Sequence, residues 1–159
     1  MVRRVGIVMT ALFSFVFIAG CSPKMRLDAP PGWKVARTEV QGDKLRLAVL
    51  ADGSGNELQV SCLTGGVETL ALLASKTLAT VDQLGGRVTE YTANMDLQAF
   101  TIRFALVNKN GRRLIGANFS LVDQADGDTV VSVIGLWPAE QDDKVAPAFD
   151  RAIQGVHCR

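Results

Sequence analysis

Apolar and polar residues alternate along much of the chain, and this period of two predicts β-strands. In Lys44–Ala51 every second position is leucine or valine, and in Glu57–Leu63 the apolar positions end on Cys62, which should point into a core. Leu97–Val107 and Arg112–Val122 alternate in the same way, and two shorter segments are also expected to be strands: Arg87–Thr92 and Trp33–Thr38. Turn sequences such as Asn108–Gly111 separate neighbouring strands, so we expect hairpins and an antiparallel sheet.

Thr129–Trp137 is strongly β-forming and apolar at nearly every position. Such a segment is typical of a central strand that is covered on both faces. Two other segments have the helical period instead. We expect helices over about Val67–Leu84, with a stripe through Leu70, Ala74, Leu78 and Val81, and over Asp143–Gly155, with Pro147 near its first turn.

The predicted apolar side of the second helix is made of five residues: Val145, Phe149, Ala152, Ile153 and Val156. The order of elements predicts the α+β class, with a mostly antiparallel sheet and two covering helices, one on each face.

The chain begins with a different pattern. Met1–Arg4 is short and positive, and Val5–Ala19 is almost wholly apolar, as in a secretory signal peptide. The apolar run is shorter than the roughly 20 residues that span a membrane comfortably. It ends in Ile18-Ala19-Gly20-Cys21, which resembles the lipobox of bacterial lipoproteins.

That resemblance implies that the Cys21 thiol receives a diacylglyceryl group, that the chain is cut before Cys21, and that the new amine is acylated, for example with palmitate. The alternatives are a single-pass anchor or an ordinary signal peptide with an incidental cysteine. Ser22 follows Cys21, which by the sorting rule of such lipoproteins implies the periplasmic face of the outer membrane in a cell with two membranes.

The domain organisation follows from this start. We expect a signal peptide over residues 1–20, a lipidated cysteine and an extended tether over 21–32, and a single α+β domain over 33–159. Pro23, Pro30 and Pro31 keep the tether extended, so that it could hold the domain roughly 30 Å from the lipid surface. Removal of Arg3 and Arg4 with the signal peptide changes the formal net charge from +1 to −1. This balance argues against nucleic acid as a partner.

Two cysteines remain once Cys21 carries lipid. Cys62 and Cys158 are an even pair in an oxidising compartment, so we expect a disulfide between them. The alternative is one buried free thiol and one free thiol in the terminal tail.

We find no catalytic, metal or cofactor site in the sequence, and therefore expect no enzyme. His157 is the only histidine and is expected to be a solvated tail residue. Asp123, Asp126 and Asp128 miss the spacing of a calcium loop. Trp33 and Trp137 could anchor a partner but are more typical of core packing.

The opening Pro31-Gly32-Trp33, the Leu-rich helix with its Gly85-Gly86 exit, the long strands and the closing helix together resemble the Mog1/PsbP-like superfamily. This resemblance implies partner binding or assembly without catalytic machinery. We therefore expect a membrane-anchored envelope lipoprotein that holds a protein partner. The alternative is a module that binds a small apolar ligand or lipid.

Overall fold

The computed structural model describes residues 24–65, 69–123 and 129–158. The predicted signal peptide, Cys21, and two of the three acids compared with a calcium loop, Asp126 and Asp128, lie outside these residues. The described strands are β1 (Met25–Leu27), β2 (Lys34–Gln41), β3 (Leu45–Ala51), β4 (Glu57–Thr64), β5 (Arg87–Asn94), β6 (Ala99–Val107), β7 (Arg113–Asp123), β8 (Thr129–Pro138) and β9 (Val156–Cys158). The helices are α1 (Leu70–Gln83), the short 3₁₀ turn η1 (Ala139–Gln141) and α2 (Asp142–Gly155).

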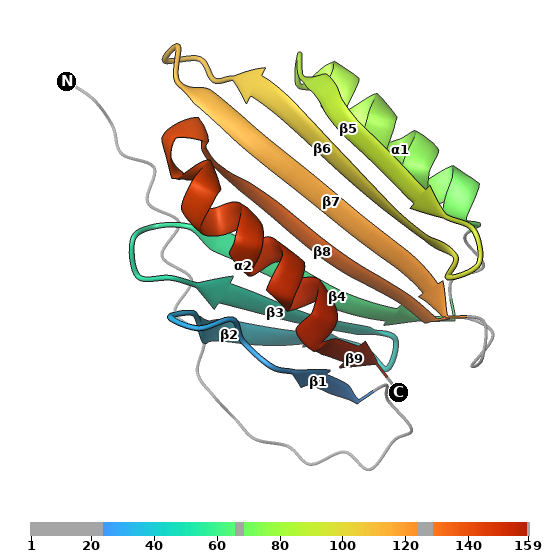
Figure 1. The fold of residues 1–159 in the computed structure, drawn as a ribbon. Coiled ribbons are helices and arrows are strands. Elements are labelled where there is room, and N and C mark those ends of the chain that lie inside the picture. Colours follow the sequence, from blue (N-terminus) through green and yellow to red (C-terminus); the bar gives the residue numbers. More distant parts are fainter. Residues whose placement is uncertain (1–23, 66–68, 124–128, 159) are drawn as a thin grey trace.

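Seven strands form one antiparallel sheet in the order β2-β3-β4-β8-β7-β6-β5, with β8 in the middle (Figure 1). The α+β class with a mostly antiparallel sheet is confirmed. The two helices pack into two separate hydrophobic clusters on opposite faces of this sheet, α2 with β4 and β8, and α1 with β6.

Helix α1 begins after Thr69, whose side chain accepts a hydrogen bond from the Leu72 amide at 3.2 Å. Thr69 thus satisfies one of the free N–H groups of the first turn. Leu70, Ala74 and Val81 are buried against the aromatic side of β6, as the helical stripe predicts. Leu78, which belongs to the same predicted stripe, is instead exposed. The helix ends before Gly85, which has a positive φ of 68°.

Helix α2 lies across the other face (Figure 1). Val145, Ala148, Phe149 and Ala152 are buried, and Phe149 lies against Trp137 with ring centroids 6.1 Å apart. Pro147 lies inside the helix and not in its first turn. Val156, predicted on the helix, belongs to strand β9 instead.

The expected tether over residues 21–32 is wrong in its second part. Met25–Leu27 forms β1, which pairs antiparallel with β9, so that Met25 lies opposite Cys158 and Leu27 opposite Val156. Both β1 side chains pack against the α2 cluster. The amide of Asp28 then donates to the Gly155 carbonyl at 2.9 Å, which ties the next segment to the end of α2. We call the β1 and β9 pair the terminal ribbon.

A disulfide joins Cys62 of β4 to Cys158 of β9, with Cα atoms 5.9 Å apart. Of the two alternatives left by the sequence, the structure therefore has the bridge and not the free thiols. Both sulfurs are buried in the α2 cluster. The bond fastens the terminal ribbon to the main sheet.

Strand β8 is central, as its composition predicts, but its second half is covered on one face only. Val131, Val133 and Trp137 are buried under α2, whereas Ile134 and Leu136 on the opposite face are 41% and 47% exposed. A helix is about 10 Å wide and strands lie about 4.8 Å apart, so α1 can cover only part of a seven-stranded face. The expectation that β8 is covered on both sides is therefore met at Val130, which is 5% exposed, and is wrong at Ile134 and Leu136.

Candidate functional site

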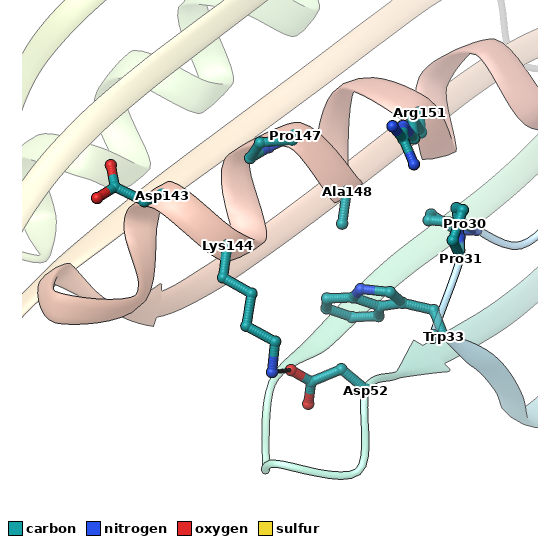
Figure 2. A pocket seen from close by; sticks show the side chains of 10 residues that line it. Pro30, Pro31, Trp33, Asp52, Asp143, Lys144, Pro147, Ala148 and Arg151 are labelled. Atoms are coloured by element: carbon teal, nitrogen blue, oxygen red, sulfur yellow. Dashed lines mark hydrogen bonds and ion pairs between the residues drawn. The ribbon is translucent and has the colours of Figure 1, made fainter.

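A surface cleft of about 430 Å³ lies between α2 and the segment that joins β1 to β2 (Figure 2). Its wall on the α2 side repeats at helical spacing through Lys144, Pro147, Ala148 and Arg151. The opposite wall comes from Pro30 to Trp33 and from Asp52 in the β3–β4 turn: Pro30, Pro31, Gly32, Trp33 and Asp52. Asp143 completes the lining.

Asp52 organises one end of this cleft. Its Oδ1 accepts the backbone amides of Ser54 at 2.7 Å and Asn56 at 3.2 Å. Its Oδ2 accepts the Asn56 amide group at 2.8 Å and Lys144 Nζ at 2.9 Å. The turn that the sequence marks only as glycine-rich is thereby bound to α2.

Asn56 extends this network to η1. The residue is buried, and its side-chain amide also donates to Gln141 Oε1 at 2.5 Å. A buried amide without partners would be costly, so these bonds fix the β3–β4 turn beside the start of α2. The cleft therefore has a rigid, hydrogen-bonded end.

The electrostatics of Asp52 follow from these contacts. Burial alone would raise its pKa, but the hydrogen bonds from Asn56, Lys144 and the Ser54 amide together lower the pKa from 3.8 to about 2. The carboxylate is thus ionised at neutral pH and held by its donors. It is a structural acceptor here and a poor general acid or base.

Asp52→Asn is expected to destabilise the protein in a pH-dependent way. Because the pKa is lower in the folded state, the contribution of Asp52 is complete above about pH 4 and is lost as the pH falls towards 2. We expect the variant to lose about 2 kcal/mol of unfolding free energy at neutral pH. Urea unfolding at several pH values measures this difference.

Asp143→Asn is the matched control, since it removes an exposed carboxylate from the same cleft and should change the free energy by less than about 0.5 kcal/mol. If the wild type and the Asp52 variant differ by the same amount at pH 2 and at neutral pH, the low pKa of Asp52 is contradicted.

Arg151 is the cleft's second cation, and in the described part of the chain it forms no ion pair. Because Lys144 is paired with Asp52, Arg151 is the unpaired positive group of the described cleft lining, near the apolar Trp33 and prolines. Trp33 itself is buried as a core residue, and so is Trp137, whose Nε1 donates to Asp142 Oδ1 at 2.9 Å. Neither tryptophan is an exposed anchor.

A second hollow, of about 560 Å³, lies beside η1 and is lined by Arg113, Ile115, Ala139, Glu140 and Asp142. The hydrogen bond from Arg112 lowers the pKa of Glu140. Both hollows are surface features with charged linings, and neither is an apolar chamber.

The larger unpartnered surface is the sheet face opposite α2. Cross-strand partners share a face, and the register places Val49, Gln59, Ile134 and Asn118 in one row. Asn118 donates to Thr77 of α1 at 2.7 Å, so α1 covers the row at β7, whereas Ile134 on β8 is exposed and Val49 at the far end of the row is buried again. We call the aliphatic surface on β3, β4 and β8 the open face; its residues are Leu45, Leu47, Leu63, Ile134 and Leu136.

Other predicted positions lie apart from both surfaces. His157 is exposed on β9, opposite Arg26. In the described ranges no group of three or more His, Cys, Asp or Glu residues is placed to hold a metal ion. Within the same ranges, no helix has the length and hydropathy needed to cross a membrane.

These surfaces could hardly be predicted from local sequence patterns. Asp52, Lys144 and Arg151 are unremarkable surface residue types, and only their spatial proximity makes a cleft. The two-sided apolar character of Thr129–Trp137 did carry the signal for the open face, but it predicted a buried strand.

Comparison with known proteins supports the fold. No protein-family model matches the chain, and no curated protein matches it either. Among solved structures it is similar to LpqN, which is involved in cell envelope biogenesis of Mycobacterium tuberculosis, with 15% identity, a TM-score of 0.59 and coverage of 86% of this chain and 84% of LpqN.

The chain is also similar to the cyanobacterial PsbP protein, CyanoP, from Synechocystis. The identity is 15%, the TM-score is 0.54, and the match covers 93% of this chain and 99% of CyanoP. The resemblance to the Mog1/PsbP-like superfamily is therefore supported at the level of fold.

Proposed function

We propose that this protein is a membrane-anchored envelope lipoprotein, without enzymatic activity, that holds a protein partner on the open face. The lipobox at Ile18–Cys21 supports the anchor, and the fold shared with LpqN, a protein of envelope biogenesis, supports the location. The proposal contains no catalytic step, because the cleft lining has no nucleophile beside a base.

The exposure of Ile134 and Leu136 on the central strand is the observation that supports partner binding. Aliphatic side chains at the centre of a sheet normally lie in a core, so the exposed pair Ile134 and Leu136, with the half-buried Leu45, Leu47 and Leu63 on the same face, marks an interaction surface. Polar residues border the exposed pair, with Gln59 on one side of Ile134 and Asn118 on the other. An apolar centre with a polar rim is the usual anatomy of a protein–protein interface.

Site-specific photocrosslinking tests this function. A photoreactive amino acid at position 136, in the full-length protein in its own membranes, is expected to give discrete protein adducts. The matched control is position 35, because Val35 is similarly exposed, at 46%, but lies opposite Leu50, whose side chain belongs to the α2 cluster. This control should give none of these adducts.

A second variant separates specific contact from chance proximity. Ile134→Asp should reduce the adduct from position 136 at least about tenfold, because a charge enters an apolar interface. Adducts with lipid alone would favour the alternative function, binding of an apolar ligand. Equal protein adducts from positions 35 and 136 would contradict the open face as the partner site.

A further inference from the structure

The terminal ribbon gathers basic groups that are scattered along the chain. Lys24 precedes β1, and Arg26 lies opposite His157 across the ribbon, with both side chains exposed. Arg151 lies one helical turn before Gly155, whose carbonyl accepts a hydrogen bond from the Asp28 amide. We call Lys24, Arg26, Arg151 and His157 the basic surface. The sequence shows no basic run beside Cys21, so only the fold creates this surface.

The inward side of the ribbon is apolar and already occupied. Met25 and Leu27 pack on the α2 cluster together with Val156 and Cys158. Alternation along a strand therefore directs Arg26 and His157 away from the domain. The Arg26 side chain is 79% exposed, and its ion pair with Asp28 is long, at 3.9 Å. An exposed pair of this kind is weak, so Arg26 can also bind another anion, although the exposed Asp28 carboxylate offsets part of its charge.

The position of β1 determines how far the basic surface lies from the lipid anchor. Only three peptide units separate Cys21 from Lys24, and they span at most about 11 Å. Charges interact with a membrane surface over roughly one Debye length, about 8–10 Å at physiological ionic strength. With an unpaired tether of roughly 30 Å, as expected from the sequence, Arg151 and His157 in the domain would have lain beyond that range.

We propose that the basic surface lies against anionic phospholipid headgroups in the lipidated protein. The inference rests on the proposed function for the anchor at Cys21. The terminal ribbon and α2 lie on one side of the sheet (Figure 1), and the open face lies on the other. The domain is thereby oriented with its partner-binding face directed away from the bilayer.

Lysine labelling of the full-length lipidated protein tests this orientation. The protein is reconstituted on vesicles of phosphatidylcholine and on vesicles of phosphatidylcholine with phosphatidylglycerol. A neutral, water-soluble acylating reagent is added, and the labelling rate of each lysine is measured by mass spectrometry. We expect Lys24 to react about fivefold more slowly on the anionic vesicles. Lys109, in the turn between β6 and β7, should be unaffected.

Charge variants give the control. Arg26→Gln with Arg151→Gln should reduce the effect at Lys24 to less than about twofold, because two positive charges leave the basic surface. The matched pair Arg37→Gln with Arg113→Gln removes the same charge from other strands and should leave the effect intact.

The possible failures are distinguishable. A protein that does not float with either vesicle has no lipid anchor, which overturns the proposed function and the inference together. A protein that floats but labels Lys24 at the same rate on both vesicles keeps its anchor and overturns the inference alone. Protection of Lys24 that persists in high salt would also overturn it, since attraction between exposed charges is screened.

Discussion

Replacing Cys62 and Cys158 together by alanine should lower the free energy of unfolding by about 4–5 kcal/mol. The two residues are 96 positions apart, and a bond that closes a loop of this length removes much of the entropy of the unfolded chain. In a domain of this size we expect a fall in melting temperature of roughly 15 °C. Thermal melting followed by circular dichroism measures it.

The oxidised and reduced forms supply the control for this experiment. Wild-type protein melted with a reducing agent should match the double variant, and the variant itself should not respond to the agent. In the reduced protein the amides of the terminal ribbon should lose their hydrogen-exchange protection first. The disulfide attaches Cys158, and with it Met25 on the paired strand, to β4. A variant that melts within about 3 °C of the oxidised wild type would show that the bond contributes little.

Trp137→Ala should cost about 3–5 kcal/mol of unfolding free energy. The indole is 1% exposed and fills the space above Gly135, where an added Cβ would come within 2.8 Å of the ring. It contacts Phe149 of α2 and donates to Asp142 at the start of that helix. Removing it leaves a cavity where α2 meets the sheet, which urea unfolding will detect.

Trp137→Phe separates the two contributions of this residue. Phenylalanine keeps most of the apolar volume but loses the N–H group, so we expect a cost of only about 1–2 kcal/mol. Asp142→Ala, which removes the acceptor and keeps the ring, should cost about as much as the lost hydrogen bond alone. If Trp137→Phe and Trp137→Ala are equally unstable, the hydrogen bond of the indole contributes more to stability than its volume.

Local patterns were sufficient for most of the sheet. A hairpin needs only alternation and a turn sequence, and the segment Leu97–Val122 around Asn108–Gly111 contains both. Strands β6 and β7 follow that prediction closely, apart from one or two residues at their ends. The disulfide was also predicted, on the expectation that Cys62 and Cys158 remain as a pair in an oxidising compartment.

Features that depend on distant partners were missed. Met25–Leu27 is too short to show a period, and the prolines that follow it, Pro30 and Pro31, are typical of an extended tether. It is a strand because β9 supplies its hydrogen bonds. In the same way Asp52 and Lys144 are 92 positions apart, and nothing local predicts their contact. The open face was missed because the composition of a strand shows that it is apolar but not whether a helix is wide enough to cover it.

The pairing of β1 with β9 also sets the order in which the domain can be completed. The ribosome makes Met25–Leu27 near the beginning of the domain and Val156–Cys158 at its end, yet each strand has the other as its only partner in the ribbon. Cys62 likewise cannot form its disulfide until Cys158 has been made. Non-local pairings of this kind slow folding, because a long loop must close before they form. Met25–Leu27 therefore has no strand partner in the ribbon until the last residues of the domain have been made.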